Sequence, residues 1–242
     1  MKKIVKPYKN SNLSKKEQII KMFDKISNKY DFLNHFLSLG LDIYWRNQLA
    51  NHVKKQQPKN ILDVATGTCD LAIALMKAKP NEIIGLDISK KMLEIGSKKL
   101  IKKSLNNKIK LIIGDSEDLP FKKDKFDAIT VSFGLRNFEN LEKGLYEINR
   151  VLKPKGKLYI LEFSKPKMFI FKKIYQFYFY HIIPRLGKLF SEDGNAYNYL
   201  PKSVDTFPYG FELKKIIRNS GYINVKSYSL SMGVASIYIA VK

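Results

Sequence analysis

Residues 61–70 and the carboxylate Asp87 have the types and spacing of a nucleoside-binding site. The segment reads Ile-Leu-Asp-Val-Ala-Thr-Gly-Thr-Cys-Asp, and Asp87 ends a second apolar run about twenty residues after Gly67. Because glycine lacks a Cβ, the backbone at Gly67 can approach a ligand closely, and Asp87 can accept hydrogen bonds from two ribose hydroxyls. The alternative for Asp87 is that it caps the helix that follows.

The charges around Gly67 distinguish between two kinds of nucleoside ligand. The dinucleotide fingerprint G-x-G-x-x-G needs further glycines for the pyrophosphate and for close helix packing. Here Gly67 is the only glycine of the turn, and Asp63 and Asp70 flank it. These carboxylates would repel a pyrophosphate and attract the cationic amino and sulfonium groups of S-adenosylmethionine. The segment therefore favours a methyltransferase over a dehydrogenase.

Polar residues also follow the third apolar run. Asp115 can accept a hydrogen bond from an adenine amino group, and the backbone N–H of Ser116 can donate to a ring nitrogen. The alternative is a plain acidic turn. Ligands of open α/β sheets bind at the carboxyl ends of the strands, so we expect both residues at the cofactor site.

Arg136 and Asn137 follow the fourth apolar run, beside the expected methyl donor. A basic side chain in a site must pair with a carboxylate or face an anionic group. Arg136 is therefore the leading catalytic or substrate-binding residue. The alternative is a surface ion pair with Glu139 or Asp70.

The elements that position these residues alternate between strand and helix. Residues 13–53 have helical periodicity, interrupted near Tyr30 and Gly40. Short apolar or β-branched runs then recur at 61–64, 83–86, 111–113, 128–131 and 158–163, followed near the end by 223–228 and 235–241. The pattern predicts an α/β fold: a mostly parallel seven-stranded sheet with helices on both faces and an antiparallel C-terminal strand pair.

Composition limits the class of protein further. The 242 residues suit one α/β domain, and the lysine-rich start lacks the apolar run of a secretory signal, so we expect a cytoplasmic protein. We expect no metal site, because Cys69 is the single cysteine and His35, His52 and His181 have no metal-ligand spacing.

The net charge of +22 is compatible with an RNA or anionic-membrane surface. However, five of the 44 basic residues are arginine, and the lysines are dispersed along the chain, as compositional drift would give. An RNA methyltransferase is disfavoured further, because the chain lacks an Asn/Asp-Pro-Pro-aromatic loop and a second cysteine for pyrimidine chemistry. A noncatalytic S-adenosylmethionine-binding subunit is the other alternative.

The chain closely resembles the C-methyltransferases of menaquinone and ubiquinone biosynthesis along almost its entire length. The most specific segments are Tyr-Asp-Phe-Leu-Asn-His-Phe-Leu-Ser-Leu-Gly-Leu-Asp-Ile-Tyr-Trp-Arg at 30–46 and Arg-Val-Leu-Lys-Pro-Lys-Gly-Lys-Leu-Tyr-Ile-Leu-Glu-Phe-Ser-Lys-Pro at 150–166. Three positions depart from the family pattern. Asp42 stands where many members have His, Cys69 where many have Gly, and Lys155 replaces the commoner Gly.

The resemblance implies a class I S-adenosylmethionine-dependent methyltransferase with a Rossmann-like fold. The family's cofactor contacts carry over to Thr68, Asp87, Asp115, Ser116 and Ser132, beside Gly67 and Asp63 from the turn itself. Single-domain organisation over 1–242 follows: a helical extension at 1–58, a cofactor-binding core at 59–165, a helical substrate-side insertion at 166–209, and a C-terminal helix and strand pair at 210–242.

The implied reaction is conversion of demethylmenaquinol to menaquinol, the last step of menaquinone biosynthesis. A dual enzyme that also methylates a benzoquinol precursor of ubiquinone is the alternative. Because a quinone is electron-poor, we expect the reduced quinol to be the acceptor, with Arg136, Asn137 and Asp70 in the network that stabilises its phenolate or relays its proton. A polyprenyl tail places the substrate in the bilayer, so we expect contact with anionic lipid at the inner membrane face. The oligomeric state stays open.

Overall fold

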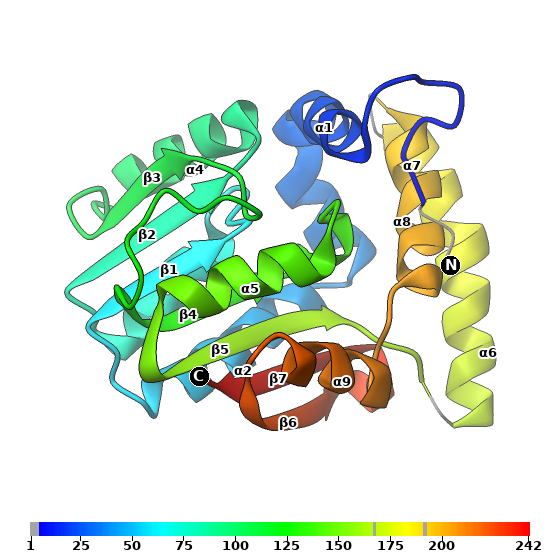
Figure 1. Ribbon diagram of the computed structural model, residues 1–242. Helices are drawn as coiled ribbons and strands as arrows, with labels where there is room; N and C mark the ends of the chain where they lie inside the picture. Colours follow the sequence, from blue (N-terminus) through cyan, green and yellow to red (C-terminus); the bar gives the residue numbers. More distant parts are fainter. Residues whose placement is uncertain (1–4, 167, 191–192) are drawn as a thin grey trace.

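The computed structural model describes residues 5–166, 168–190 and 193–242 (Figure 1). Within these residues the strands form one seven-stranded sheet in the order β3-β2-β1-β4-β5-β7-β6. Their bounds are β1 Asn60–Val64, β2 Glu82–Asp87, β3 Ile109–Ile113, β4 Phe126–Ser132, β5 Leu152–Phe163, β6 Ile223–Leu230 and β7 Ala235–Val241. The strands β1 to β5 are parallel, and β7 is antiparallel to both β5 and β6. The sequence-based prediction of the sheet is confirmed.

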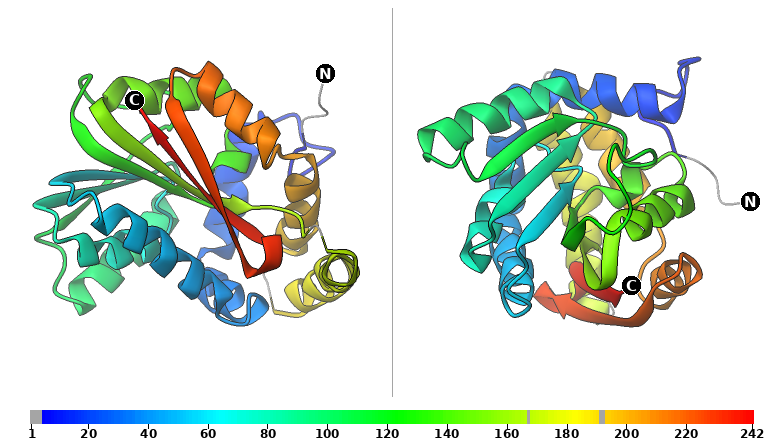
Figure 2. Two further views of the ribbon diagram at one scale, coloured as in Figure 1. Left: turned by 90° about the horizontal axis from the view of Figure 1, so that it is seen from below. Right: turned by 60° about the vertical axis from the view of Figure 1, so that its left-hand side comes forward.

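The helices surround the sheet on two faces and at one end (Figure 2). They are α1 Lys15–Leu37, α2 Leu41–Lys54, α3 Asp70–Leu75, α4 Lys90–Lys102, α5 Leu141–Val151, α6 Phe169–Phe177, α7 Ile183–Phe190, α8 Gly194–Thr206 and α9 Phe211–Asn219. Short helical turns are η1 Met76–Ala78, η2 Leu135–Asn137, the π turn η3 Tyr178–Ile182 and η4 Ser231–Gly233.

A separate apolar cluster covers each face of the sheet. Side chains of α2, α3 and α4 pack on one face around Leu49, Leu75 and Tyr159. Those of α5 and α9 pack on the other face around Phe126 and Leu145. Since the parallel strands are covered on both sides, they read as continuous apolar runs in the sequence.

A third apolar cluster lies beyond the carboxyl ends of the parallel strands. It joins α1, η3, α7 and α8 through residues such as Met22, Leu33, Phe179 and Tyr197. In Figure 1 α7 and α8 stand at the right, beyond the end of the arrow of β5, and α1 lies at the top centre. The N-terminal extension and the insertion therefore form one helical wall over the end of the sheet where ligands bind.

The interruption that we expected near Tyr30 is wrong, whereas the one near Gly40 is confirmed. Helix α1 runs unbroken through Tyr30 and ends at Leu37, and Gly40 with φ +76° separates it from α2. The polar residues that suggested a break instead point toward neighbouring elements, since the hydroxyl of Thr68 donates to Asp31 Oδ1. No helix in the described parts of the chain is long and apolar enough to cross a membrane.

Candidate active site

The loop after β1 brings Gly67 and Asp87 together. The backbone N–H of Gly67 donates to Asp87 Oδ2 at 2.8 Å, and the N–H of Ser89 donates to Asp87 Oδ1 at 2.9 Å. Gly67 has φ +55°, a conformation that costs an L-residue about 1–2 kcal/mol. Ser89, whose hydroxyl accepts from Met92 N, is the N-cap of α4, so Asp87 is not the cap. Burial raises the pKa of Asp87, although the two backbone donors oppose the shift.

Asp63 and Thr68 lie behind this loop and are buried. Asp63 accepts hydrogen bonds of 2.6 Å from Thr66 and from Thr130, its register partner on β4. Burial raises the pKa of Asp63 to about 6, against the effect of these hydroxyls. Thr68 bonds to Asp31 of α1 and receives a hydrogen bond from Lys99. In the structure both predicted cofactor residues brace the loop and lie outside the lining of the cavity that it borders.

A cavity of about 700 Å³ lies over the carboxyl ends of β1 to β4, and the other predicted cofactor residues converge on it. Those residues are Gly67, Asp87, Asp115, Ser116 and Ser132. Helix α1 closes the cavity with Lys16, Ile19 and Phe23. The Nζ atom of Lys16 lies 2.6 Å from Asp115 Oδ2, so the carboxylate that we expected at the adenine is paired with α1 in this structure.

The residues present fit S-adenosylmethionine. Asp87 keeps lone pairs for ribose hydroxyls after its two backbone bonds, because a carboxylate offers about four acceptor positions. The backbone of Gly67 presents no Cβ to the ligand. Ser132 Oγ is buried in the same lining and has no hydrogen-bond partner among the described residues, as expected of a group that awaits a ligand.

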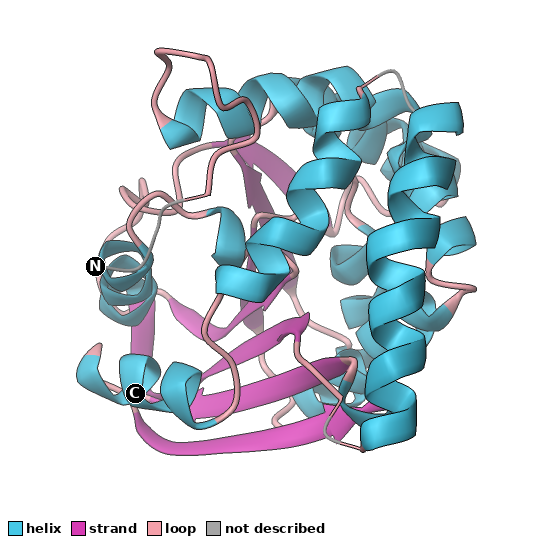
Figure 3. Ribbon diagram, turned by 90° about the vertical axis from the view of Figure 1, so that its right-hand side faces the viewer, coloured by secondary structure: helices cyan, strands magenta, loops and turns pink. Residues whose placement is uncertain are grey.

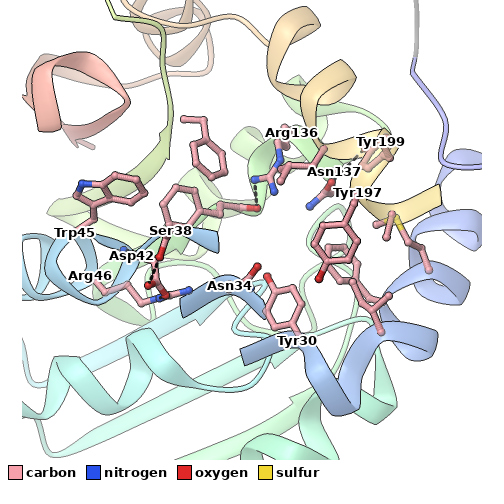
Figure 4. A pocket seen from close by; sticks show the side chains of 17 residues that line it. Tyr30, Asn34, Ser38, Asp42, Trp45, Arg46, Arg136, Asn137, Tyr197 and Tyr199 are labelled. Atoms are coloured by element: carbon pink, nitrogen blue, oxygen red, sulfur yellow. Dashed lines mark hydrogen bonds and ion pairs between the residues drawn. The ribbon is translucent and has the colours of Figure 1, made fainter. Parts of the chain in front are cut away.

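A second cavity, of about 680 Å³, adjoins the first (Figure 4). Phe23, Tyr30, Phe133 and Asn137 line both. Phe133 separates them in a strained conformation, with φ +55°, and its ring lies 4.6 Å from that of Phe163, centroid to centroid. Strain of this kind clusters at functional sites and persists where the surrounding structure holds it.

Arg136 and Asn137, which we expected beside the methyl donor, both border the second cavity. Arg136 pairs with Glu162 at the end of β5, with 2.9 Å between the guanidinium Nη1 and Oε1, and with neither of the partners considered above. Glu162 is 1% exposed, and burial raises its pKa against the opposing charge of Arg136. The Nε atom of Arg136 is buried without a partner among the described residues. Asn137 Oδ1 accepts a 3.2 Å hydrogen bond from Tyr199, which leaves the Asn137 amide free to donate.

Asp70 lies outside the lining of both cavities. Its carboxylate is ion-paired with Lys99 of α4, which also lies 2.7 Å from Asp31 of α1. His35 Nε2 is 3.8 Å from the other Asp70 oxygen. The structure therefore places Asp70 in a polar junction between α1, α3 and α4 and does not bring it to Arg136 and Asn137.

Sequence reasoning missed a cluster of polar side chains at the end of α1 and on α2. Three of them, Ser38, Asp42 and Arg46, line the second cavity. Ser38 donates to Asp42 Oδ1 at 2.7 Å, His35 Nδ1 lies 2.8 Å from Asp42 Oδ2, and Arg46 is ion-paired with Asp42. Burial acts to raise the pKa of Asp42, but Arg46, Ser38 and His35 outweigh it and lower the pKa. The only signal was the departure of Asp42 from the family pattern. Figure 4 shows Ser38 and Asp42 across the cavity from Asn137.

An apolar channel of about 1320 Å³ continues from the second cavity. Trp45, Phe163, Tyr197 and Leu200 line both spaces, and helix α6 adds Phe171, Ile174 and Tyr175 to the lining of the channel. Aromatic and aliphatic side chains dominate this channel, which suits a long hydrocarbon group.

In the described residues no group of three or more His, Cys, Asp or Glu side chains is placed to hold a metal ion.

The sheet order and the loop after β1, whose Gly67 is hydrogen-bonded to Asp87 at the end of β2, define a class I S-adenosylmethionine-dependent methyltransferase. A similar fold occurs in such an enzyme from Aquifex aeolicus, with a TM-score of 0.57 and 18% identity, over 79% of this chain and 88% of that one. A model of the ubiE/COQ5 methyltransferase family matches residues 11–242. The chain belongs to the ubiE/COQ5 methyltransferase family.

Named relatives cover nearly the whole chain. It is 45% identical to a demethylmenaquinone methyltransferase of Bacteroides fragilis, over 98% of this chain and 97% of the relative. It is 42% identical to a ubiquinone/menaquinone biosynthesis C-methyltransferase, UbiE, of Geotalea daltonii, over 94% and 97% of the respective chains. Both relatives are thus similar along the loops and helices that build the site.

Proposed function

We propose that this enzyme transfers the methyl group of S-adenosylmethionine to a ring carbon of demethylmenaquinol and so forms menaquinol. The observation that carries the proposal is the series of three adjoining spaces: the cofactor cavity, an aromatic cavity with polar ends that shares lining residues with it, and an apolar channel that shares lining residues with the aromatic cavity. These spaces suit in turn a nucleoside, a dihydroxylated ring and a polyprenyl tail. The name of the Bacteroides fragilis relative supports the same acceptor.

In this proposal the chain holds the cofactor through Asp87, Asp115, Ser116 and Ser132 around Gly67. The bound cofactor supplies an electrophilic methyl group and departs as S-adenosylhomocysteine. The protein contributes orientation, since holding donor and acceptor in line is worth roughly 7 to 11 kcal/mol relative to encounter in solution. Helix α1 covers the cofactor cavity through Ile19 and Phe23 and excludes water from the reacting atoms.

Arg136 and Asn137 would stabilise the phenolate that activates the ring carbon. The unpartnered Nε of Arg136 and the free amide of Asn137 are both hydrogen-bond donors on one side of the aromatic cavity. Arginine holds its proton too tightly to be the base, so its role is electrostatic. Asp70, outside the cavity, would act as a positioning residue, because Lys99 links it to Asp31 of α1.

The hydroxyl next to the reacting carbon would give up its proton as the new carbon–carbon bond forms. The hydrogen on that carbon then leaves as a second proton and the hydroxyl is restored, so the net reaction releases one proton. On the opposite side of the cavity, Ser38 donates its proton to Asp42 Oδ1 and accepts from Asp42 N at 3.4 Å, so one lone pair of Ser38 can accept from the second hydroxyl of a quinol. A quinone has no hydroxyl to donate there, which supports the reduced acceptor.

The proposal includes a cytoplasmic enzyme that collects its substrate at the inner face of the membrane, because a polyprenyl tail keeps the quinol in the bilayer. The test is a transfer assay with labelled S-adenosylmethionine, offered chemically reduced demethylmenaquinone, a demethylated benzoquinol and RNA in parallel. Label on the naphthoquinol supports the proposal, and label on both quinols supports the dual enzyme that the Geotalea daltonii relative's name describes. Label on RNA alone would overturn it.

A further inference from the structure

We propose that the outer face of helix α6, with the neighbouring rim residues Leu39 and Met232, is the surface by which the enzyme docks on an anionic lipid bilayer. The inference rests on the proposed function for its polyprenyl substrate, and it adds the surface that makes the contact. In Figure 3 the side of the molecule that carries α6 faces the viewer, and the continuous helical segment formed by α6, η3 and α7 runs along it.

Helix α6 carries an exposed apolar face of unusual density. Phe169, Ile170 and Phe177 are 70%, 69% and 59% exposed, and no side chain of α6 is buried among the described residues. Soluble proteins rarely leave a contiguous group of large apolar side chains in water without a partner for it. The outer face of α6 therefore needs a partner.

The opposite face of the same helix lines the apolar channel. Phe171 and Tyr175 of α6 line this space, at a spacing that places them on one side of the helix, and Tyr178 of the adjoining π turn η3 continues the same row. A helix that is apolar on both faces is covered on both faces. The inner face of α6 lines the channel, so the outer face is covered by a binding partner outside this chain.

The rim of the channel connects the two surfaces. Leu39, Ile174 and Met232 line the channel and are 79%, 60% and 60% exposed. The channel thus opens among side chains that are themselves apolar and exposed. This continuity argues for a lipid phase, because a polyprenyl tail can then pass from bilayer to channel without crossing water.

The charge of the segment favours anionic lipid. Residues 168–190 contain four cations, Lys172, Lys173, Arg185 and Lys188, and no Asp or Glu. Lys172 and Lys173 are exposed on α6, and the Nζ of Lys173 lies 4.4 Å from the ring centroid of Phe169. Apolar and aromatic residues with interspersed lysines are typical of helices that lie in the membrane interface.

The test compares vesicle binding of matched variants. The triple variant Phe169→Ser/Ile170→Ser/Phe177→Ser removes the outer face and spares the residues that line the channel. Its control is Ile101→Ser/Phe211→Ser, which removes side chains that are 64% and 71% exposed on α4 and α9. Binding is measured by co-sedimentation with vesicles of phosphatidylglycerol and phosphatidylcholine, and with phosphatidylcholine alone.

We expect the wild type and the control to bind the anionic vesicles at low salt and less so at high salt. We expect the triple variant to bind about tenfold more weakly or worse. Equal binding by the triple variant, or no binding by the wild type at low salt, would overturn the proposal. A triple variant that becomes monomeric from a wild-type dimer would show instead that this face joins two copies of the chain.

A second readout separates docking from chemistry. With a soluble quinol that has a short tail, the triple variant should keep the wild-type kcat, whereas with long-tailed quinol in vesicles its activity should fall by about the loss of binding. If neither the wild type nor the triple variant methylates either quinol, the proposed acceptor is wrong. Docking is then judged from the sedimentation experiment alone. If the triple variant matches the wild type on vesicle-borne quinol, α6 is not the docking surface.

Discussion

The pair formed by Arg136 and Glu162 makes a sharp prediction, because it separates a catalytic role from a structural one. The two side chains are 8% and 1% exposed, and 2.9 Å separates Nη1 from Oε1. Arg136→Met leaves a buried carboxylate without its cation, which typically costs about 3–5 kcal/mol of unfolding free energy. We expect urea denaturation of this variant to show a loss of that size. Loss of activity in Arg136→Met alone would therefore be ambiguous.

The double variant Arg136→Met/Glu162→Gln resolves the ambiguity. Glutamine keeps the shape of the carboxylate and is uncharged, so we expect most of the lost stability to return. If Arg136 stabilises the phenolate, kcat should stay about 100- to 1000-fold below wild type in the double variant, as for removal of one donor to a developing oxyanion. Near wild-type turnover with cofactor affinity intact would refute the catalytic role.

The pH dependence of the unfolding free energy tests whether the unpaired carboxylate of Glu162 causes the loss of stability in Arg136→Met. Burial already raises the pKa of Glu162 in the wild type, and removal of Arg136 should raise it further. A carboxyl group whose pKa is raised by folding contributes stability at low pH, which is lost as the pH rises through the folded-state pKa. The stability gap between wild type and Arg136→Met should therefore widen once the pH passes the folded-state pKa of Glu162 in the wild type, which lies above the usual value for a glutamate. A gap that does not change with pH would refute the unpaired carboxylate as its cause.

The remaining predictions concern the cofactor loop. Asp87→Asn should weaken S-adenosylmethionine binding about tenfold or more by calorimetry, because one ribose acceptor becomes a donor; the exposed Asp118→Asn should leave it unchanged. Gly67→Ala should lower the unfolding free energy by about 1–2 kcal/mol, measured by denaturation, since φ is +55°; no loss would show that the loop relaxes. The Cys69 thiol should resist a thiol reagent at pH 8 and react in urea, because it is buried and burial raises its pKa to about 12; rapid labelling of the native protein would contradict this.

The sheet and half of the site could be predicted because both depend on local pattern. In a parallel α/β sheet each apolar run is a strand, and the residues after it meet at one edge. Gly67, Asp87, Asp115 and Ser116 were predicted on this ground and Ser132 from the family resemblance, and all five line the same cavity. They lie together because the sheet itself determines their positions.

The same reasoning could not separate lining residues from bracing ones. Asp63 and Thr68 are polar residues at the same strand end, but their side chains turn toward Thr130 and Asp31. Which way a side chain at a strand end points depends on register and on the helix packed above it. The sequence shows neither directly, because the partners are distant along the chain.

The aromatic cavity, which is the acceptor side of the site, depends on tertiary packing more than the cofactor cavity does. Ser38, Asp42 and Arg46 reach the aromatic cavity only because α1 passes over the strand ends unbroken and α2 turns back at Gly40. Arg136 meets Glu162 because β4 and β5 are neighbours, although the two residues lie far apart in sequence. A pattern of periodicity cannot report such pairs.

We expect acceptor specificity to reside in the helices that are added to the sheet. The cofactor cavity is lined largely by residues that follow strands, and the enzyme from Aquifex aeolicus shares the fold at 18% identity. Most residues that line the aromatic cavity come from α1, α2 and α8, and α6 contributes to the lining of the channel. Lys15 joins the two parts, because its ammonium group donates to the backbone carbonyls of Arg136 and Phe138 at 3.0 and 2.6 Å. Helix α1 thus holds the loop of Arg136 while it lines the cofactor cavity, so we expect binding of either ligand to act on the same helix.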